Sequence, residues 1–78
     1  MNWFVGNVGG VTDGPYKSRQ IAQREAASVC KGGDLQAVRV AAGFYTVQTF
    51  DKHSSLVNEM AFFTEAGALR QGFKPSDF

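Results

Sequence analysis

The chain has one cysteine, one histidine and no long apolar run, and each shortage excludes a class of protein. Its 78 residues are enough for one domain. Cys30 has no second cysteine to pair with, so an internal disulfide is excluded. A zinc site built from cysteine and histidine needs more such ligands than Cys30 and His53. We therefore expect no disulfide framework, no metal site and no other cofactor, and look to core packing or association for stability.

Charge is also scarce and balanced. Eight lysines and arginines are set against seven acidic residues, which gives a formal net charge of +1. Nucleic-acid-binding domains usually have a basic stripe, and this chain has no run of like charge. No apolar run is long enough to span a membrane. The opening residues MNWFVGN lack the basic flank and apolar core of a signal peptide. We therefore expect a cytoplasmic protein without membrane contact.

What the chain does contain is enough apolar residues for a core, because hydrophobic residues make up 44% of it. Residues 2–8 are rich in aromatic and β-branched side chains and predict a strand. The glycines of NVGG indicate a tight turn, and residues 11–13 can return as a short second strand. We expect Pro15 to end that strand, since proline cannot continue a central ladder. If residues 11–13 are irregular instead, the sheet has three strands.

A helix is predicted after this turn. Ser18 is a good N-cap, because its hydroxyl can accept a free backbone N–H of the first turn. Gly32 or Gly33 supplies the C-terminal stop. At 100° per residue, one face of this helix carries only apolar side chains. These are Ile21, Ala22, Ala26, Val29 and Cys30.

The second half predicts a hairpin followed by a helix. Leu35–Val40 and Phe44–Phe50 are the β-rich strands, joined through AAG. Ser54 or Ser55 would cap a helix over Leu56–Arg70, with Gly72 as the stop. The predicted fold class is α+β, a single two-layer domain over residues 1–72 with a tail at 73–78. Its antiparallel sheet has about four strands and both helices on one face, in the order β-β-α-β-β-α.

No group of residues predicts catalysis. His53 has only Asp51 nearby in sequence, which favours a solvated loop histidine over a general base. Cys30 lies on the apolar helical face and reads as a packing residue. The glycine-rich GNVGG lacks the lysine of a phosphate-binding loop and precedes a strand, so a hairpin turn is favoured. We expect no enzyme, and no small-molecule substrate is evident.

Two surfaces remain as candidates for binding. Aromatic residues in the predicted strands would lie partly on the open face of a two-layer domain, where nucleobases can stack. These are Trp3, Phe4, Phe44, Tyr45 and Phe50. The sparse basic residues make this nucleic-acid module the alternative hypothesis.

The favoured surface lies on the predicted second helix. Its inward face is expected to carry Leu56, Val57, Met60, Phe63, Thr64, Gly67 and Ala68. Three further apolar residues, Phe62, Ala66 and Leu69, fall on the opposite side, and a helix apolar all round is normally covered on both sides. Either the tail, with Phe73 and Phe78, folds back over this stripe, or a partner covers it. We predict a partner-binding surface of Phe62, Ala66, Leu69 and Phe73, contacting a protein or a second copy of the chain.

The segment GPYKSRQIAQREAA, after a short strand, resembles a pattern found in small uncharacterised proteins of bacteriophages and mobile elements. There a GPF or GPY, a Ser or Thr cap and an alanine-rich helix join two β segments. The resemblance implies an α+β protein of a bacterial host's cytoplasm that blocks a host machine by stoichiometric binding, as anti-CRISPR proteins do. We therefore expect a non-enzymatic binding protein that acts by protein–protein contact.

Overall fold

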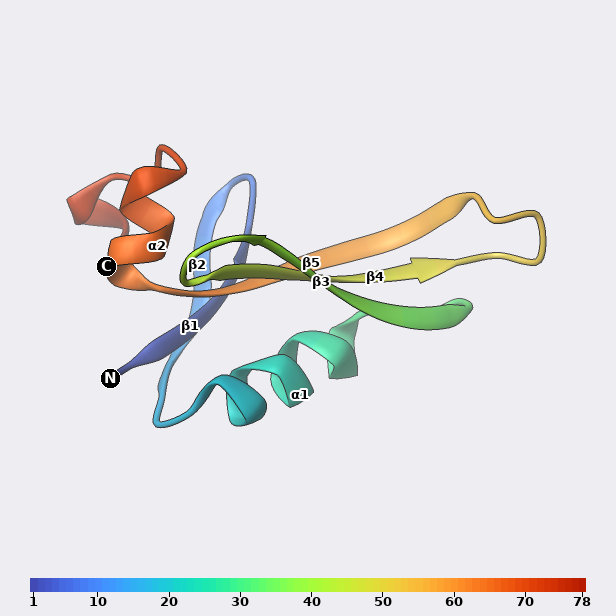
Figure 1. Ribbon diagram of the computed structural model, residues 1–78, viewed down its shortest axis with the longest axis horizontal. Helices are drawn as coiled ribbons and strands as arrows, with labels where there is room; N and C mark the ends of the chain where they lie inside the picture. Colours follow the sequence, from blue (N-terminus) through green and yellow to red (C-terminus); the bar gives the residue numbers. More distant parts are fainter.

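Five antiparallel strands form one sheet in the computed structural model, which describes residues 1–78 (Figure 1). Their order across the sheet is β2-β1-β5-β4-β3. The strands are β1 (Trp3–Asn7), β2 (Gly10–Tyr16), β3 (Asp34–Ala41), β4 (Phe44–Phe50) and β5 (Leu56–Thr64). The helices are α1 (Arg19–Val29), α2 (Glu65–Arg70) and a short 3₁₀ helix η1 (Pro75–Asp77). The predicted α+β class with one antiparallel sheet is confirmed, with five strands where about four were expected.

Helix α1 forms where the sequence predicted it. The Ser18 side chain accepts a hydrogen bond from the backbone N–H of Ile21 at 3.2 Å, which confirms the N-cap. Ala22 and Ala26 are fully buried, because their small side chains let α1 lie close to β1 and β5. Cys30 is buried at the end of α1 and packs in the same cluster. Local capping and one apolar face are therefore enough to position this helix.

The opposite face of the sheet is covered by the C-terminal segment (residues 71–78), which follows α2. Phe44 and Phe63 stack with ring centroids 5.2 Å apart, and Phe73 packs against Phe63 at 4.9 Å. Phe78 meets the edge of the Phe63 ring at 6.1 Å. The sheet therefore lies between α1 on one face and α2 with the C-terminal segment on the other (Figure 1). The expected two-layer domain with both helices on one face is wrong.

Residues 56–64 form a strand where the sequence predicted a helix. β5 is a central strand that pairs with β1 on one side and with β4 on the other. Because it is covered on both faces, consecutive side chains of residues 61–64 are all buried. When consecutive residues are apolar, the residues three and four positions apart are apolar too, so the run also fits the pattern of a buried helix. This explains the wrong prediction. Ser54 and Ser55 accordingly lie in the turn between β4 and β5, and cap no helix.

The turns and caps at the other end of the sheet hold α2 in place. Thr64 caps α2, and its hydroxyl accepts from the N–H of Gly67 at 3.0 Å. Gly67 lies against the turn between β3 and β4, where a Cβ atom would come within 2.2 Å of the Gly43 carbonyl oxygen. The backbone N–H of Thr64 donates to that same oxygen at 2.9 Å. The predicted β3–β4 hairpin is confirmed, and its turn anchors the start of α2.

Neither α1 nor α2 has the length and apolar content that a membrane crossing requires. The molecule is elongated, with principal extents of 38 × 22 × 20 Å. Its long direction follows β3, β4 and β5, whose far ends extend beyond α1 (Figure 1). That overhang leaves part of the sheet without a covering helix.

Candidate functional site

The four predicted partner-binding residues do not share a surface. Phe62 lies in β5 under α1 with no exposed area, and its ring stacks on Tyr45 at 5.3 Å. Ala66 is exposed on α2, and Leu69 is half-buried there. Phe73 packs on the opposite face of the sheet from Phe62. The predicted common helical face is wrong because Phe62 belongs to a strand, and the stripe does not exist as a surface.

The aromatic residues of the strands divide between two covered faces. Trp3 and Tyr45 pack in the cluster beneath α1. Phe4 and Phe44 pack on the other face with the C-terminal segment. Phe50 is half-buried near the far end of β4. The structure therefore has no broad open aromatic face of the kind that the nucleic-acid alternative requires.

The two residues considered for catalysis lie apart, His53 in a turn and Cys30 in the core. His53 is exposed in the turn between β4 and β5, where Asp51 accepts hydrogen bonds from the backbone N–H groups of His53 and Ser55. Asp51 thus shapes the turn and does not orient the imidazole. The Cys30 thiol is buried, and burial raises its pKa, with a further contribution from Glu59. A raised pKa disfavours the thiolate, which is the nucleophilic form.

The edge of the sheet at β2 is irregular. The pairing of β2 with β1 shifts register twice. Pro15 lies within β2 although we expected it to end the strand, and it is accommodated because an edge strand has one unpaired side. The Tyr16 hydroxyl donates to the Asp13 carboxylate, which raises the pKa of Tyr16 to about 12 and lowers that of Asp13. Bulges, proline and charge are the features that prevent pairing with another strand.

The edge at β3 is less protected, because its only charged residues are Asp34 and Arg39 and its pairing is regular over most of its length. β3 keeps one register with β4 from Asp34 to Arg39, and the only shift falls between Arg39 and Ala41. It contains no proline, and nothing lies on its outer side in the strand order. Leu35 and Val40 expose 55% and 51% of their surface. β3 is therefore a long, regular and partly apolar edge, which is suited to accept another strand.

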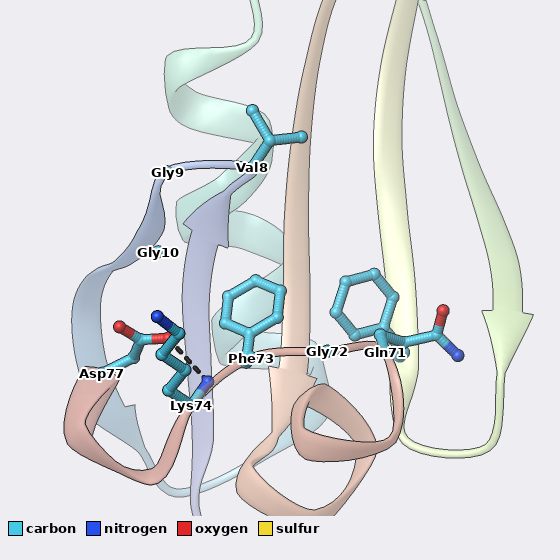
Figure 2. A pocket seen from close by; sticks show the side chains of 9 residues that line it. Val8, Gly9, Gly10, Gln71, Gly72, Phe73, Lys74 and Asp77 are labelled. Atoms are coloured by element: carbon cyan, nitrogen blue, oxygen red, sulfur yellow. Dashed lines mark hydrogen bonds between the residues drawn. The ribbon is translucent and has the colours of Figure 1, made fainter.

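A second feature lies on the face of the sheet opposite α1. The tip of the β1–β2 hairpin and the C-terminal segment line an open cavity of about 570 Å³, into which Phe73 points (Figure 2). A smaller cavity of about 280 Å³ shares Val8, Phe44 and Phe73 with it. The smaller one is lined by Asn7, Val8, Phe44, Thr46, Glu59, Ala61 and Phe73.

Thr46 is the unusual member of this lining. Its side chain is only 8% exposed, and its hydroxyl oxygen has no hydrogen-bond partner. Nearly all buried polar groups in proteins are paired, so such a group calls for an explanation. No pattern in the sequence indicates this, because threonine is common in strands and the neighbouring elements decide whether its hydroxyl finds a hydrogen-bond partner.

Neither the open β3 edge nor the cavity was predicted from the sequence. The order of strands decides which strand is an edge, and that order depends on β5. No model of a known protein family, no curated protein and no solved structure matches the chain.

Proposed function

We propose that this is a non-enzymatic binding protein that acts by protein–protein contact, with β3 as the edge to which a strand of the partner is added. The observation that carries the proposal is the difference between the two edges of the sheet. β2 carries proline, bulges and an acidic side chain, whereas β3 keeps one register from Asp34 to Arg39 and has no proline and no charged residue between those two. A sheet that protects one edge and leaves the longer one open is suited to strand addition.

Backbone pairing supplies the geometry of such a contact and most of its affinity, and side chains add to the affinity and supply specificity. About half of the eight residues of β3 direct their N–H and C=O groups outward. Each hydrogen bond formed there contributes about 0.5–1.5 kcal/mol net, against an association cost of about 4–15 kcal/mol. Burial of Leu35 and Val40 against the added strand adds about 1 kcal/mol each, since both are half exposed. These numbers predict a contact that needs further apolar residues of the partner.

The identity of the partner follows from the sequence resemblance alone. The GPYKSRQIAQREAA segment contains the end of β2 and most of α1, which form the scaffold and not the open edge. Its likeness to small phage and mobile-element proteins supports a bacterial host protein as the target and inhibition as the outcome. A second copy of the chain is the other source of a strand, and a mass measurement by light scattering separates the two.

The test exploits the alternation of backbone groups along a strand. Of two neighbouring residues, Gln36 and Ala37, one directs its N–H toward β4 and the other outward. Proline at the residue whose N–H points toward β4 should destabilise the fold, because it removes a hydrogen bond of the sheet. Proline at the residue whose N–H points outward should leave the fold intact and block strand addition. The measurement is quantitative capture of binding proteins from bacterial lysate, alongside thermal unfolding of each variant.

Gln36→Ala is the matched control, because it changes a side chain on the same edge and keeps the backbone donor. We expect the outward-position proline variant to lose the captured partner and Gln36→Ala to retain it. If the folded proline variant captures the same proteins at the same level as the parent chain, the contact does not use this edge.

A further inference from the structure

The smaller cavity places three kinds of side chain in sequence along the strands. On β4, the side chains of Phe44, Thr46 and Gln48 lie on the face opposite α1, because successive residues of a strand point to opposite faces. They follow one another along the strand at steps of about 7 Å. Ala61 lies opposite Thr46, and Glu59 lies opposite Gln48 on β5. Along the cavity, an aromatic residue is therefore followed by the Thr46–Ala61 pair and then by a carboxylate.

The aromatic wall is made of two rings. Phe44 and Phe73 lie edge to face with their centroids 5.9 Å apart, and both line the cavity. Val8, at the tip of the β1–β2 hairpin, adds a third apolar side chain. This end of the cavity suits a flat apolar group, such as a phenyl ring or a short hydrocarbon chain.

The other end is polar and acidic. Glu59 is the only charged residue in the lining. The Gln48 amide donates to its Oε2 atom at 2.5 Å, which orients the carboxylate and leaves Oε1 for another donor. Asn7 is held by a bond from the Gly9 N–H to its Oδ1 atom, so its amide N–H groups point away from that bond. The larger cavity adds Lys74 and Asp77, whose charges offset one another.

Thr46 stands between these two ends. Its hydroxyl oxygen is buried and has no partner, which costs free energy. A ligand in the cavity could bind this hydroxyl after rotation of the Thr46 side chain about χ1, which exchanges the positions of the hydroxyl and the methyl group. A cation with N–H donors placed between Thr46 and Glu59 would satisfy the hydroxyl and the free carboxylate oxygen together. The volume of about 280 Å³ lies at the small end of ligand sites and suits about ten non-hydrogen atoms.

We propose that this cavity is a binding site for a small amphipathic amine, with its apolar group against Phe44 and Phe73 and its ammonium group between Thr46 and Glu59. The site is separate from the β3 edge and does not rest on the function proposed there. An amine is chosen over an anion because the lining offers one carboxylate and no basic side chain.

The test uses 2-phenylethylamine as the probe and the neutral 2-phenylethanol as its counterpart, followed through the backbone amide signals of isotopically labelled protein. We expect saturable shifts at Asn7, Thr46 and Glu59 in the millimolar range. The amine should bind about fivefold more tightly than the alcohol at low salt, the upper end for an exposed ion pair. Equal binding of the two probes, shifts centred elsewhere, or no saturation would each overturn the proposal.

Two variants and a control test the assigned residues. Glu59→Gln should remove the fivefold preference for the amine, and Thr46→Val should weaken amine binding several-fold. Glu25→Gln removes an exposed carboxylate from α1 on the other side of the sheet and should change nothing. A preference for the amine that survives Glu59→Gln in a folded protein would show that the carboxylate does not recognise the cation.

A lysine side chain of another protein carries the same ammonium group on a longer stem. A capped single lysine, with both backbone ends blocked, therefore serves as a third probe. Shifts as large as those with 2-phenylethylamine would assign the site to a protein's lysine. Binding several-fold weaker than that of the aromatic amine would assign it to a free small molecule.

Discussion

Replacing Thr46 with valine should make the protein more stable. Valine has nearly the same shape as threonine, and it replaces an unpaired buried hydroxyl with a methyl group. Burying a hydroxyl without a hydrogen bond costs about 1–3 kcal/mol, and a buried methyl group contributes about 0.8 kcal/mol. Because the site lines a cavity, we take the lower part of that range and expect a gain of about 1–2 kcal/mol. For a domain of this size, that gain corresponds to a rise in Tm of about 5–15 °C.

Urea unfolding followed by circular dichroism measures the effect, and an unchanged slope shows that the unfolded state is unaltered. Thr49→Val is the matched control on the same strand. Thr49 is also buried, but its hydroxyl donates to the Lys31 carbonyl at 3.4 Å, so its loss should bring no gain. If Thr46→Val is neutral or destabilising, the Thr46 hydroxyl has a partner in solution, and the reasoning that singles it out fails.

Three further predictions concern other elements. Ser18→Ala should lower the free energy of unfolding by about 1 kcal/mol through loss of the α1 cap, measured by urea unfolding, and should leave partner binding intact. Cys30 should react slowly with a thiol reagent in the native protein and quickly once unfolded; native labelling at the rate of a free peptide thiol would contradict its burial. In a Tyr45→Phe background, ultraviolet titration should find Tyr16 ionising near pH 12, and Asp13→Asn should lower that midpoint. Because the folded pKa of Tyr16 is raised from 10.0, its bond to Asp13 stabilises the fold below pH 10 and is lost as pH rises towards 12.

The N-terminal half was predictable because its signals are local. Each signal affects only residues close to it in the sequence. These signals are the Ser18 cap, the small residues Ala22 and Ala26 of α1, and the glycines of the turn after Val8. Each of these is read correctly without knowing where the rest of the chain lies. α1 and the β1–β2 turn therefore appear where the sequence placed them.

β5 was not predictable in the same way, because its conformation depends on distant partners. Phe62 and Phe63 are adjacent in sequence and are buried on opposite faces, one under α1 and the other under the C-terminal segment. A pattern that is apolar on every side fits a buried helix as well as a strand enclosed by two layers. Only pairing with β1 and β4 decides between them, and that pairing also decides that β3 is an edge and that Thr46 lines a cavity.

The seam between β1 and β5 has a consequence for how the protein is made. It joins Trp3 to Thr64 and Gly6 to Ala61, residues from opposite ends of the chain. At translation rates of roughly 5–20 residues per second, β5 follows β1 by about 3–12 s. During that time β1 has no strand of β5 to pair with, and Val5 and Ala22 cannot yet be enclosed by Phe62. The apolar side chains of β1 and α1 therefore cannot be buried in the finished core until β5 has been synthesised.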